Sequence, residues 1–268
     1  MLRTRVVVGA ILAVGAVLVI VLGKWVYFTV MVLLALLALN EFFRMTRSYR
    51  PLALAGYIGL GFMLYCAWYR TLSGVLASIG LLVLVTFLLG ALGGVRPGIT
   101  GRMAVTVLGG VYLGLGFGHL LLMRRLEAPA GSSDAGMALV LTVVFGTWAG
   151  DTLAYFVGRY FGSTPMAPRL SPKKTWEGFL GGILGTVLAV VLVGVYTDLK
   201  PSESLILGLV IAIVGPLGDL FESLVKRDVN VKDAGAFLPG HGGVLDRFDA
   251  LLFSAVAVFY AATGLLGY

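Results

Sequence analysis

Nine long apolar runs follow one another along the chain, and short polar segments separate them. A helix that crosses a bilayer needs about 20 predominantly apolar residues, and each run has close to that length. The pattern therefore predicts nine transmembrane helices. Their expected bounds are 6–23, 26–43, 52–69, 74–92, 103–123, 137–161, 178–198, 203–225 and 245–267.

The composition of the chain supports a membrane protein and excludes a soluble domain or a disordered chain. Hydrophobic residues make up 59% of the 268 residues and charged residues only 12%, whereas a soluble domain carries about a quarter charged residues. We expect an all-α, polytopic integral membrane helix bundle. The apolar stretch after Arg5 lacks a convincing cleavage site, so it is interpreted as a retained first helix and not as a signal peptide. Cys66 is the only cysteine, which excludes an intrachain disulfide and a cysteine-rich zinc site.

The basic residues are divided unevenly between the two sides of the predicted bundle. Fifteen of the 20 lysines and arginines fall on the side of the N-terminus, and five fall on the other side. Cytoplasmic loops carry an excess of Lys and Arg, so the N-terminus is expected in the cytoplasm and, with nine spans, the C-terminus outside. This topology accounts for the net charge of +7, and no nucleic-acid partner is expected.

The acidic residues are also distributed unevenly, because ten of the 13 lie from Asp151 onward. Residues 1–135 are therefore predicted to be a transmembrane scaffold of about five helices. Residues 136–268 are predicted to be a catalytic region of about four helices, with cytoplasmic loops at 163–177 and 226–244.

Asp151 lies well inside the sixth predicted span. An ionisable residue at that depth is unfavourable unless it faces a partner or water, so Asp151 is a functional candidate. The alternative is an aspartate that is protonated or satisfied by a neighbouring hydroxyl group. The small residues Ala154, Gly158 and Gly162 recur at a spacing of four, which is typical of a helix-packing stripe.

Two adjacent lysines, Lys173 and Lys174, follow Ser171 in the loop 163–177. Lysines beside hydroxyl groups can hold a polyphosphate. They can equally serve only to keep this loop in the cytoplasm, and their spacing alone does not decide between the two roles.

The eighth span ends in a polar stripe. Asp219, Glu222, Ser223 and Lys226 are separated by three, four and seven positions, so they project from one helical face. A solvated helix end would explain Lys226 and Arg227, but it does not explain Asp219, which lies nearly two turns deeper.

Asp246 and Asp249 lie one turn apart at the start of the last span. The glycines of Gly240-His-Gly-Gly243 allow the backbone to approach a ligand closely. His241 could ligate zinc, but the only other histidine is His119 in the middle of the fifth span, so a phosphate-binding or loop-anchoring role is favoured for His241. His119 is expected to be a packed, hydrogen-bonded helix residue.

Acidic residues on two spans and lysines on two loops are thus expected at one face of the membrane. Carboxylate oxygens suit Mg²⁺, which commonly bridges to substrate phosphates, and lysines suit the phosphates themselves. The arrangement predicts a site for a magnesium-bound nucleotide, although the chain has neither a Walker A motif nor a dinucleotide-binding glycine fingerprint.

From Ser223 to Asp249 the chain resembles the signature of the phosphatidate cytidylyltransferase (CDP-diacylglycerol synthase) family. The upstream segments around Asp151, Ser171 and Asp219 are similar to that family too, so the resemblance covers about residues 140–268. The residues that carry the signature are Ser223, Lys226, Arg227, Lys232, Asp233, Pro239, His241, Gly242, Gly243, Asp246, Arg247 and Asp249.

The resemblance implies that CTP and phosphatidic acid react to give CDP-diacylglycerol and pyrophosphate. It implies Mg²⁺, with room for a second cation such as K⁺, held by Asp219, Asp246 and Asp249. The implied catalytic residues are Asp219, Asp246, Lys226, Asp249 and Asp151. The implied substrate-binding residues are Ser171, Lys173, Lys174, Glu222, Ser223, Arg227, Lys232, Asp233, His241 and Arg247.

The resemblance also implies a location in the plasma membrane, the inner membrane of a bacterium, with the active site in the cytoplasm. Membrane lipids and a second copy of the chain, in a homodimer, complete the expected partners. Two rival functions stay open. A CTP-dependent polyprenol or phytol kinase, or an archaeal-type CDP-lipid synthase, would share the nucleotide site. A transporter would instead use Asp151 and Asp219 as ion sites and release no pyrophosphate.

Overall fold

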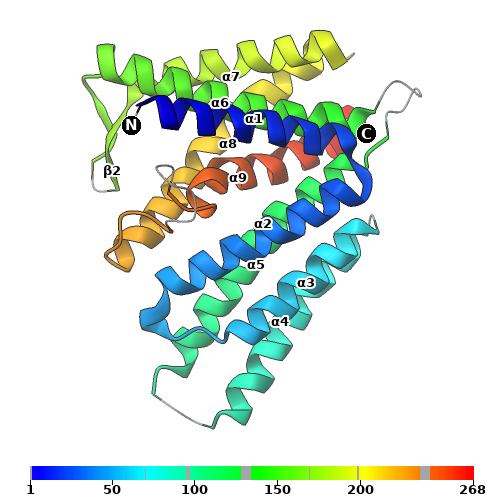
Figure 1. Ribbon diagram of the computed structural model, residues 1–268, viewed down its shortest axis with the longest axis vertical. Helices are drawn as coiled ribbons and strands as arrows, with labels where there is room; N and C mark the ends of the chain where they lie inside the picture. Colours follow the sequence, from blue (N-terminus) through cyan, green and yellow to red (C-terminus); the bar gives the residue numbers. More distant parts are fainter. Residues whose placement is uncertain are drawn as a thin grey trace. The chain divides into compact units, whose positions relative to one another are not determined.

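The computed structural model describes residues 2–69, 71–94, 97–127, 134–168, 170–197, 199–235 and 242–268, with side chains from residue 9 onward. These residues form a succession of α-helices with one small β-hairpin (Figure 1). The α-helices are α1 (Leu2–Leu22), α2 (Lys24–Met45), α3 (Ala53–Trp68), α4 (Leu72–Leu92), α5 (Ile99–Arg124), α6 (Ala135–Phe161), α7 (Trp176–Thr197), α8 (Pro201–Asp228) and α9 (Leu245–Ala261). The shorter elements are η1 (Arg47–Tyr49), β1 (Pro165–Ala167), β2 (Ser171–Thr175) and η2 (Ala262–Leu266).

Each of the nine predicted spans coincides with an α-helix, and the expected class of an all-α polytopic membrane protein is confirmed. Within the described residues, seven helices are long and apolar enough to cross a membrane. The other two apolar segments, Gly9–Leu22 of α1 and Ala53–Trp68, are shorter. At 1.5 Å per residue α3 covers about 24 Å, which is less than the roughly 30 Å of a hydrocarbon core.

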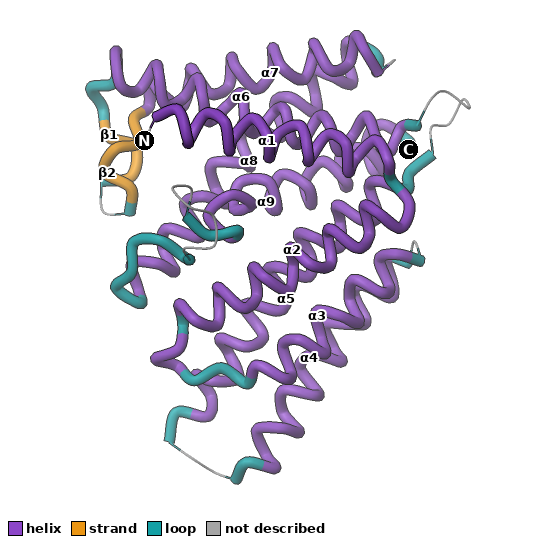
Figure 2. Tube along the Cα trace, in the orientation of Figure 1, coloured by secondary structure: helices purple, strands orange, loops and turns teal. Residues whose placement is uncertain are grey.

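The segment predicted as a plain loop at 163–177 contains the hairpin β1–β2, which Figure 2 shows between α6 and α7. The strands pair antiparallel, with Pro165 opposite Thr175 and Ala167 opposite Ser171. The predicted loop between the sixth and seventh spans thus contains a paired hairpin, in which strand pairing satisfies backbone groups that would otherwise be left to water. The hairpin gives Lys173 and Lys174 a fixed place on β2.

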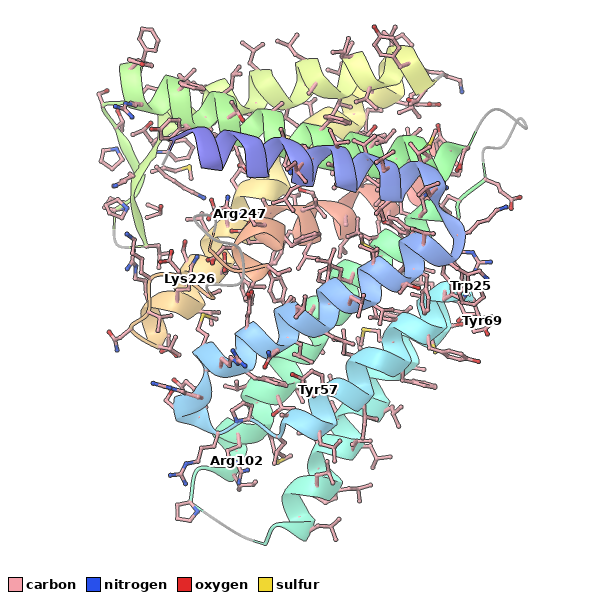
Figure 3. The ribbon with its side chains drawn as sticks, in the orientation of Figure 1. Trp25, Tyr57, Tyr69, Arg102, Lys226 and Arg247 are labelled. Carbon is pink, nitrogen blue, oxygen red and sulfur yellow. The ribbon has the colours of Figure 1, made fainter. Side chains whose placement is uncertain are left out.

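The described chain divides into two compact units, which are treated separately. Unit 1 consists of Met1–Leu122 and Asp228–Phe248. In this unit the Tyr27 hydroxyl of α2 donates a hydrogen bond to the Leu120 carbonyl of α5 (3.2 Å). Figure 3 shows Trp25 and Tyr69 at one end of the unit and Arg102 at the other. Arg102 donates from Nε to the carbonyl oxygen of Arg50 (2.7 Å).

Unit 2 consists of Met123–Arg227 and Asp249–Tyr268, and α6 packs along α7 within it (Figure 1). Small residues allow the close approach: a methyl group at Gly182 of α7 would lie 3.2 Å from the Ala154 Cβ of α6. Gly158 likewise lies against Gly178, where an added methyl group would come within 3.5 Å of the Gly178 Cα. The predicted packing stripe on the sixth span is thereby confirmed.

The compact units divide the chain differently from the predicted boundary at residue 135. The segment Asp228–Phe248, which carries much of the signature, belongs to the unit of the first five helices. The assignment of scaffold and catalytic roles to 1–135 and 136–268 stays a prediction. His119 is 1% exposed, and its Nδ1 lies 2.7 Å from the Leu115 carbonyl oxygen, as expected of a packed helix residue.

Candidate active site

Unit 2 contains a cavity of about 310 Å³ among α6, the hairpin, α7, α8 and the start of α9. Its charged lining consists of Asp151 from α6, Lys173 and Lys174 from β2, and Asp219 from α8. The rest of the lining is largely apolar and includes Met166, Phe179, Ile211, Ala212 and Ala250. The cavity therefore joins a charged region to an apolar one, which suits a ligand with a polyanionic head and a hydrophobic body.

The hairpin and the first turn of α7 fix the positions of the two lysines. The carboxylate of Glu177 accepts hydrogen bonds from the Ser163 hydroxyl (2.7 Å) and from the amides of Ser163 and Thr164 (both 3.2 Å). Thr175 Oγ1 accepts from the Gly178 amide (3.1 Å) and so satisfies a free N–H group at the N-terminus of α7. The strand that carries Lys174 is therefore held at its C-terminal end by the helix that follows.

Lys174 forms an ion pair with Asp219 across the cavity. The Lys174 side chain is 24% exposed and the Asp219 side chain 34% exposed, so neither is a fully solvated surface group. Lys173 also lines the cavity and is exposed. An ammonium group already paired with a carboxylate at the cavity wall is well placed to exchange that partner for a phosphate oxygen.

The polar stripe on α8 continues from Asp219, which lines the cavity, toward the C-terminal end of the helix. Glu222 is 1% exposed, and its Oε2 lies 3.2 Å from the Lys226 ammonium group. Figure 3 shows Lys226 on the last part of α8. Asp249 of α9 lies near Glu222, Asp219 and Lys226. Three carboxylates and two lysines on α8, α9 and β2 thus lie in one part of unit 2.

A glycine allows α8 and α9 to approach closely at this point. A methyl group at Gly218 would overlap the backbone carbonyl oxygen of Asp249 and lie 3.1 Å from the Ala250 Cα. Any larger residue at 218 would therefore push Asp249 away from Asp219 and Glu222.

We expect Gly218→Ala to lower kcat by about tenfold or more, since small displacements in a site can have large kinetic effects. Gly208→Ala, on the same helix, is the matched control. Steady-state kinetics of the two purified variants would test this, and an unchanged kcat for Gly218→Ala would contradict it.

Asp246 lies in unit 1 and holds the segment before α9 together. Its Oδ2 accepts hydrogen bonds from the amides of Gly243 (2.9 Å) and Ala234 (3.0 Å). Gly242, which directly precedes Gly243, has a φ of +81°, a conformation that favours glycine.

A second contact within unit 1 involves Asp228, the last residue of α8. The Tyr49 hydroxyl of η1 donates to Asp228 Oδ2 (2.7 Å), and this hydrogen bond raises the pKa of Tyr49 above its ordinary value. The contact joins residues 179 positions apart in the sequence. It fixes the start of the segment Asp228–Phe248.

The remaining predicted site residues lie outside the cavity lining. Arg227 donates from Nε to the Leu170 carbonyl oxygen (3.5 Å), next to Ser171 at the start of β2. Ser223 is half-buried, whereas Lys232, Asp233 and Arg247 are exposed. His241 lies outside the described residues. Met166 and Phe179 line the cavity but were not predicted, because apolar side chains in an apolar span give no pattern that distinguishes a ligand from packing.

The chemistry of the donor groups limits which metal this site can hold. Asp219 and Asp249 supply carboxylate oxygens, but the described residues contain no group of three or more His, Cys, Asp or Glu side chains placed around one point. Mg²⁺ is commonly bound by one or two carboxylates together with water and substrate phosphates. The donor set therefore fits an oxygen-liganded cation that is shared with a bound polyphosphate.

Comparisons with known proteins place the chain among related sequences. A family model described as "Cytidylyltransferase family" matches residues 3–265. The chain is 31% identical over 267 residues to the phosphatidate cytidylyltransferase of Bacillus subtilis, which covers 94% of each chain. It is 33% identical over 241 residues to the uncharacterized protein YnbB of Escherichia coli, covering 88% of this chain and 79% of that one. It is 48% identical to the phosphatidate cytidylyltransferase of Aquifex aeolicus over 121 residues, which are 45% of either chain.

Proposed function

Because the chain belongs to the cytidylyltransferase family, we propose that it transfers CMP from CTP to phosphatidate, giving CDP-diacylglycerol and pyrophosphate. The observation that carries this proposal is the cavity of unit 2, where Lys173, Lys174, Asp151 and Asp219 meet an apolar wall. The charged part of this lining suits the phosphates of a nucleotide and of a lipid head group, and the apolar part suits a lipid whose chains remain in the bilayer.

The reaction demands charge neutralisation more than proton transfer. A phosphate oxygen of phosphatidate, already ionised, forms a bond to the α-phosphorus of CTP, and the bond from that phosphorus to the pyrophosphate oxygen breaks. The main obstacle is the approach of one anion to another. Lys173 and Lys174 reduce this repulsion by binding phosphate oxygens, and Lys226 adds positive charge on the adjoining face of α8.

Asp219 and Asp249 would hold Mg²⁺, and Asp246, one turn before Asp249 on α9, is the third proposed ligand. When bound there, Mg²⁺ would supply neutralisation of the charge on the substrate phosphates. We also propose that this site can bind a second cation such as K⁺. Ser223 and His241 are proposed to orient the substrates. The other proposed substrate-binding residues are Ser171, Glu222, Arg227, Lys232, Asp233 and Arg247.

Pyrophosphate release by the purified protein in detergent tests the proposed function. We expect release with CTP and phosphatidate together, and not with ATP, GTP or UTP or without the lipid. Release of CDP with a lipid alcohol would instead identify a kinase. Ion flux that depends on membrane potential, without pyrophosphate, would identify a transporter.

The protein is proposed to lie in the bacterial inner membrane with the active site in the cytoplasm. Arg50 and Arg102 of unit 1 support this orientation, since they lie together, with Arg102 Nε donating to the Arg50 carbonyl oxygen. Basic residues favour the cytoplasmic side of a membrane. With this orientation CTP reaches the site directly.

Cysteine labelling in intact cells tests the orientation. In a Cys66→Ala background, a cysteine replacing Ser171 on β2 should resist an impermeant thiol reagent, because it is expected in the cytoplasm. A cysteine replacing Ser202, an exposed residue at the start of α8, should react. Labelling of the Ser171 variant, with protection of the Ser202 variant, would reverse the orientation and place the cavity on the wrong side for CTP.

A further inference from the structure

A buried carboxylate of α2 contacts the segment that leads into α9. Glu41 is 7% exposed, and its Oε2 accepts a hydrogen bond from the Leu245 amide at 2.9 Å. Leu245 is the first residue of α9, and it lies 204 positions from Glu41 in the sequence. Both residues belong to unit 1, so this contact lies within one compact body.

Two glycines of the signature segment leave space for this carboxylate. A methyl group at Gly235 would lie 2.5 Å from Glu41 Oε1, and a methyl group at Gly243 would lie 2.6 Å from Oε2. Either distance is too short for an alanine side chain without displacement of the carboxylate. Gly243 was expected to admit a ligand, but within the described structure it makes room for Glu41.

The position of Glu41 matches a known requirement of helix N-termini. The first N–H groups of a helix have no partner inside the helix, and a negative charge beside them interacts favourably with the helix dipole. Serine, threonine or aspartate directly before the helix usually meets this requirement, but residues 242–244 are Gly-Gly-Val. Glu41 supplies the acceptor from a different helix, so the start of α9 is attached to α2.

The same few residues also determine the position of Asp246. Asp246 accepts from the Gly243 amide, and Gly243 in turn lies against Glu41. Leu245, bound by Glu41, directly precedes Asp246. Any rotation of the first turn of α9 must therefore disturb both carboxylates together.

We infer that Glu41 is a positioning residue, which holds the first turn of α9 and with it the carboxylate of Asp246. This inference rests on the proposed function for its kinetic part. Glu41 is not among the described residues that line the cavity, and it acts through the Leu245 amide and the two glycines. A residue of the N-terminal helices thus controls the geometry of the C-terminal signature.

Two substitutions at Glu41 separate the hydrogen bond from simple packing. Glu41→Gln keeps an acceptor oxygen for the Leu245 amide and nearly the same volume, whereas Glu41→Leu keeps the volume and removes the acceptor. We expect Glu41→Leu to lower kcat by about tenfold or more, the scale for a buried amide that loses its acceptor. The KM for CTP should change by less than about threefold, and Glu41→Gln should keep kcat within about threefold of the parent.

Hydrogen exchange of the substrate-free protein in detergent provides a readout that does not depend on activity. Amides in the peptide 242–250 should exchange at least about tenfold faster in Glu41→Leu, while peptides from α4 should be unchanged. The matched control is Glu203→Leu, because Glu203 is 8% exposed and also accepts an amide hydrogen bond, from Lys200 at 3.2 Å. That control should leave both kcat and exchange in 242–250 unchanged.

Gly243→Ala tests the same contact without altering Glu41 and covers the case in which Glu41→Leu does not fold. Its methyl group should displace the carboxylate and give the same lowered kcat and faster exchange. The inference would be overturned if amides in 242–250 exchanged at the parental rate in Glu41→Leu or Gly243→Ala. It would also be overturned if Glu41→Gln and Glu41→Leu lost kcat equally. Failure of the parent to release pyrophosphate would count against the proposed function instead, since exchange is measured without substrate.

Discussion

Replacing Asp219 with asparagine is expected to lower kcat by at least about a hundredfold, the scale on which loss of a preorganised electrostatic group acts. The substitution keeps the shape of the side chain but removes a negative charge from the cavity wall. It also leaves Lys174 without the carboxylate that it pairs with. Pyrophosphate release from CTP and phosphatidate, measured over a range of Mg²⁺ concentrations, would show a lower maximal rate and a higher Mg²⁺ requirement.

Folding should survive this change, because it removes a partly buried charge and not a packed apolar side chain. Asp228→Asn is a suitable control on the same helix, since Asp228 binds Tyr49 at the exposed end of α8 and lies outside the cavity. The control should keep kcat within about threefold, because substitutions at exposed positions have small effects. Near-normal turnover of Asp219→Asn at low Mg²⁺ would remove Asp219 from the proposed ligands.

Asp246→Asn is also expected to lower kcat by about a hundredfold. Part of this loss could come from weaker hydrogen bonds to the Gly243 and Ala234 amides, and not only from the lost charge. Asparagine keeps one oxygen that can accept from the Gly243 and Ala234 amides. The loss of charge should therefore affect the reaction more than the fold. Hydrogen exchange in 242–250 close to that of the parent, together with a kcat lowered by about a hundredfold, would separate the two contributions. Faster exchange would show that the turn itself has opened.

The fold was predictable from the sequence because each helix is encoded locally. A run such as Leu72–Leu92 has a mean hydropathy of 2.7 over 18 residues, which is typical of a transmembrane helix. The polar stripe of α8 was equally predictable, since a spacing of three or four residues fixes a helical face without any tertiary information. The ion pair between Lys226 and Glu222 follows from that spacing.

Contacts between distant segments were not predictable in the same way. Nothing in the apolar pattern shows that β2 places Lys174 on Asp219, because a five-residue strand between two membrane helices leaves no periodic signal. The segment 163–177 was predictable as a connection between two spans, but its pairing into a hairpin was not. Likewise, the uneven distribution of the acidic residues predicts only a scaffold for residues 1–135, and it indicates no role for Glu41.

A signal for Glu41 was nevertheless present. The rule that makes a charged residue inside an apolar span a functional candidate was applied to Asp151, and it applies equally to Glu41 in the span 26–43. Asp151 lines the cavity of unit 2, and Glu41 holds the start of α9 in unit 1. In both cases a lone carboxylate in a membrane helix indicates a defined contact. Only the coordinates distinguish a ligand-facing carboxylate from one that binds the backbone.

Lys174→Gln is expected to lower kcat/KM for CTP by about a hundredfold, whereas Lys173→Gln should have a smaller effect, on the order of tenfold. The sequence left both lysines open to a purely topological role. A lysine that only keeps a loop in the cytoplasm should be fully solvated, but Lys174 is 24% exposed and paired with Asp219 inside the cavity. Attraction to CTP that is equal in the ground and transition states would appear in KM, and attraction that grows as pyrophosphate leaves would appear in kcat.

A double-mutant cycle with Asp219→Asn tests whether Lys174 acts through this pair. Each single substitution already breaks the ion pair, so the double variant should lose less than the sum of the two single losses. Groups in direct contact usually couple by about 0.5–3 kcal/mol, whereas independent sites add to within about 0.5 kcal/mol. The KM for phosphatidate should change less than the KM for CTP. If the two losses simply add, Lys174 and Asp219 act on different groups of the substrate. If Lys174→Gln keeps the parental kcat/KM for CTP in correctly inserted protein, the lysine is a topological residue and the nucleotide phosphates must be held elsewhere.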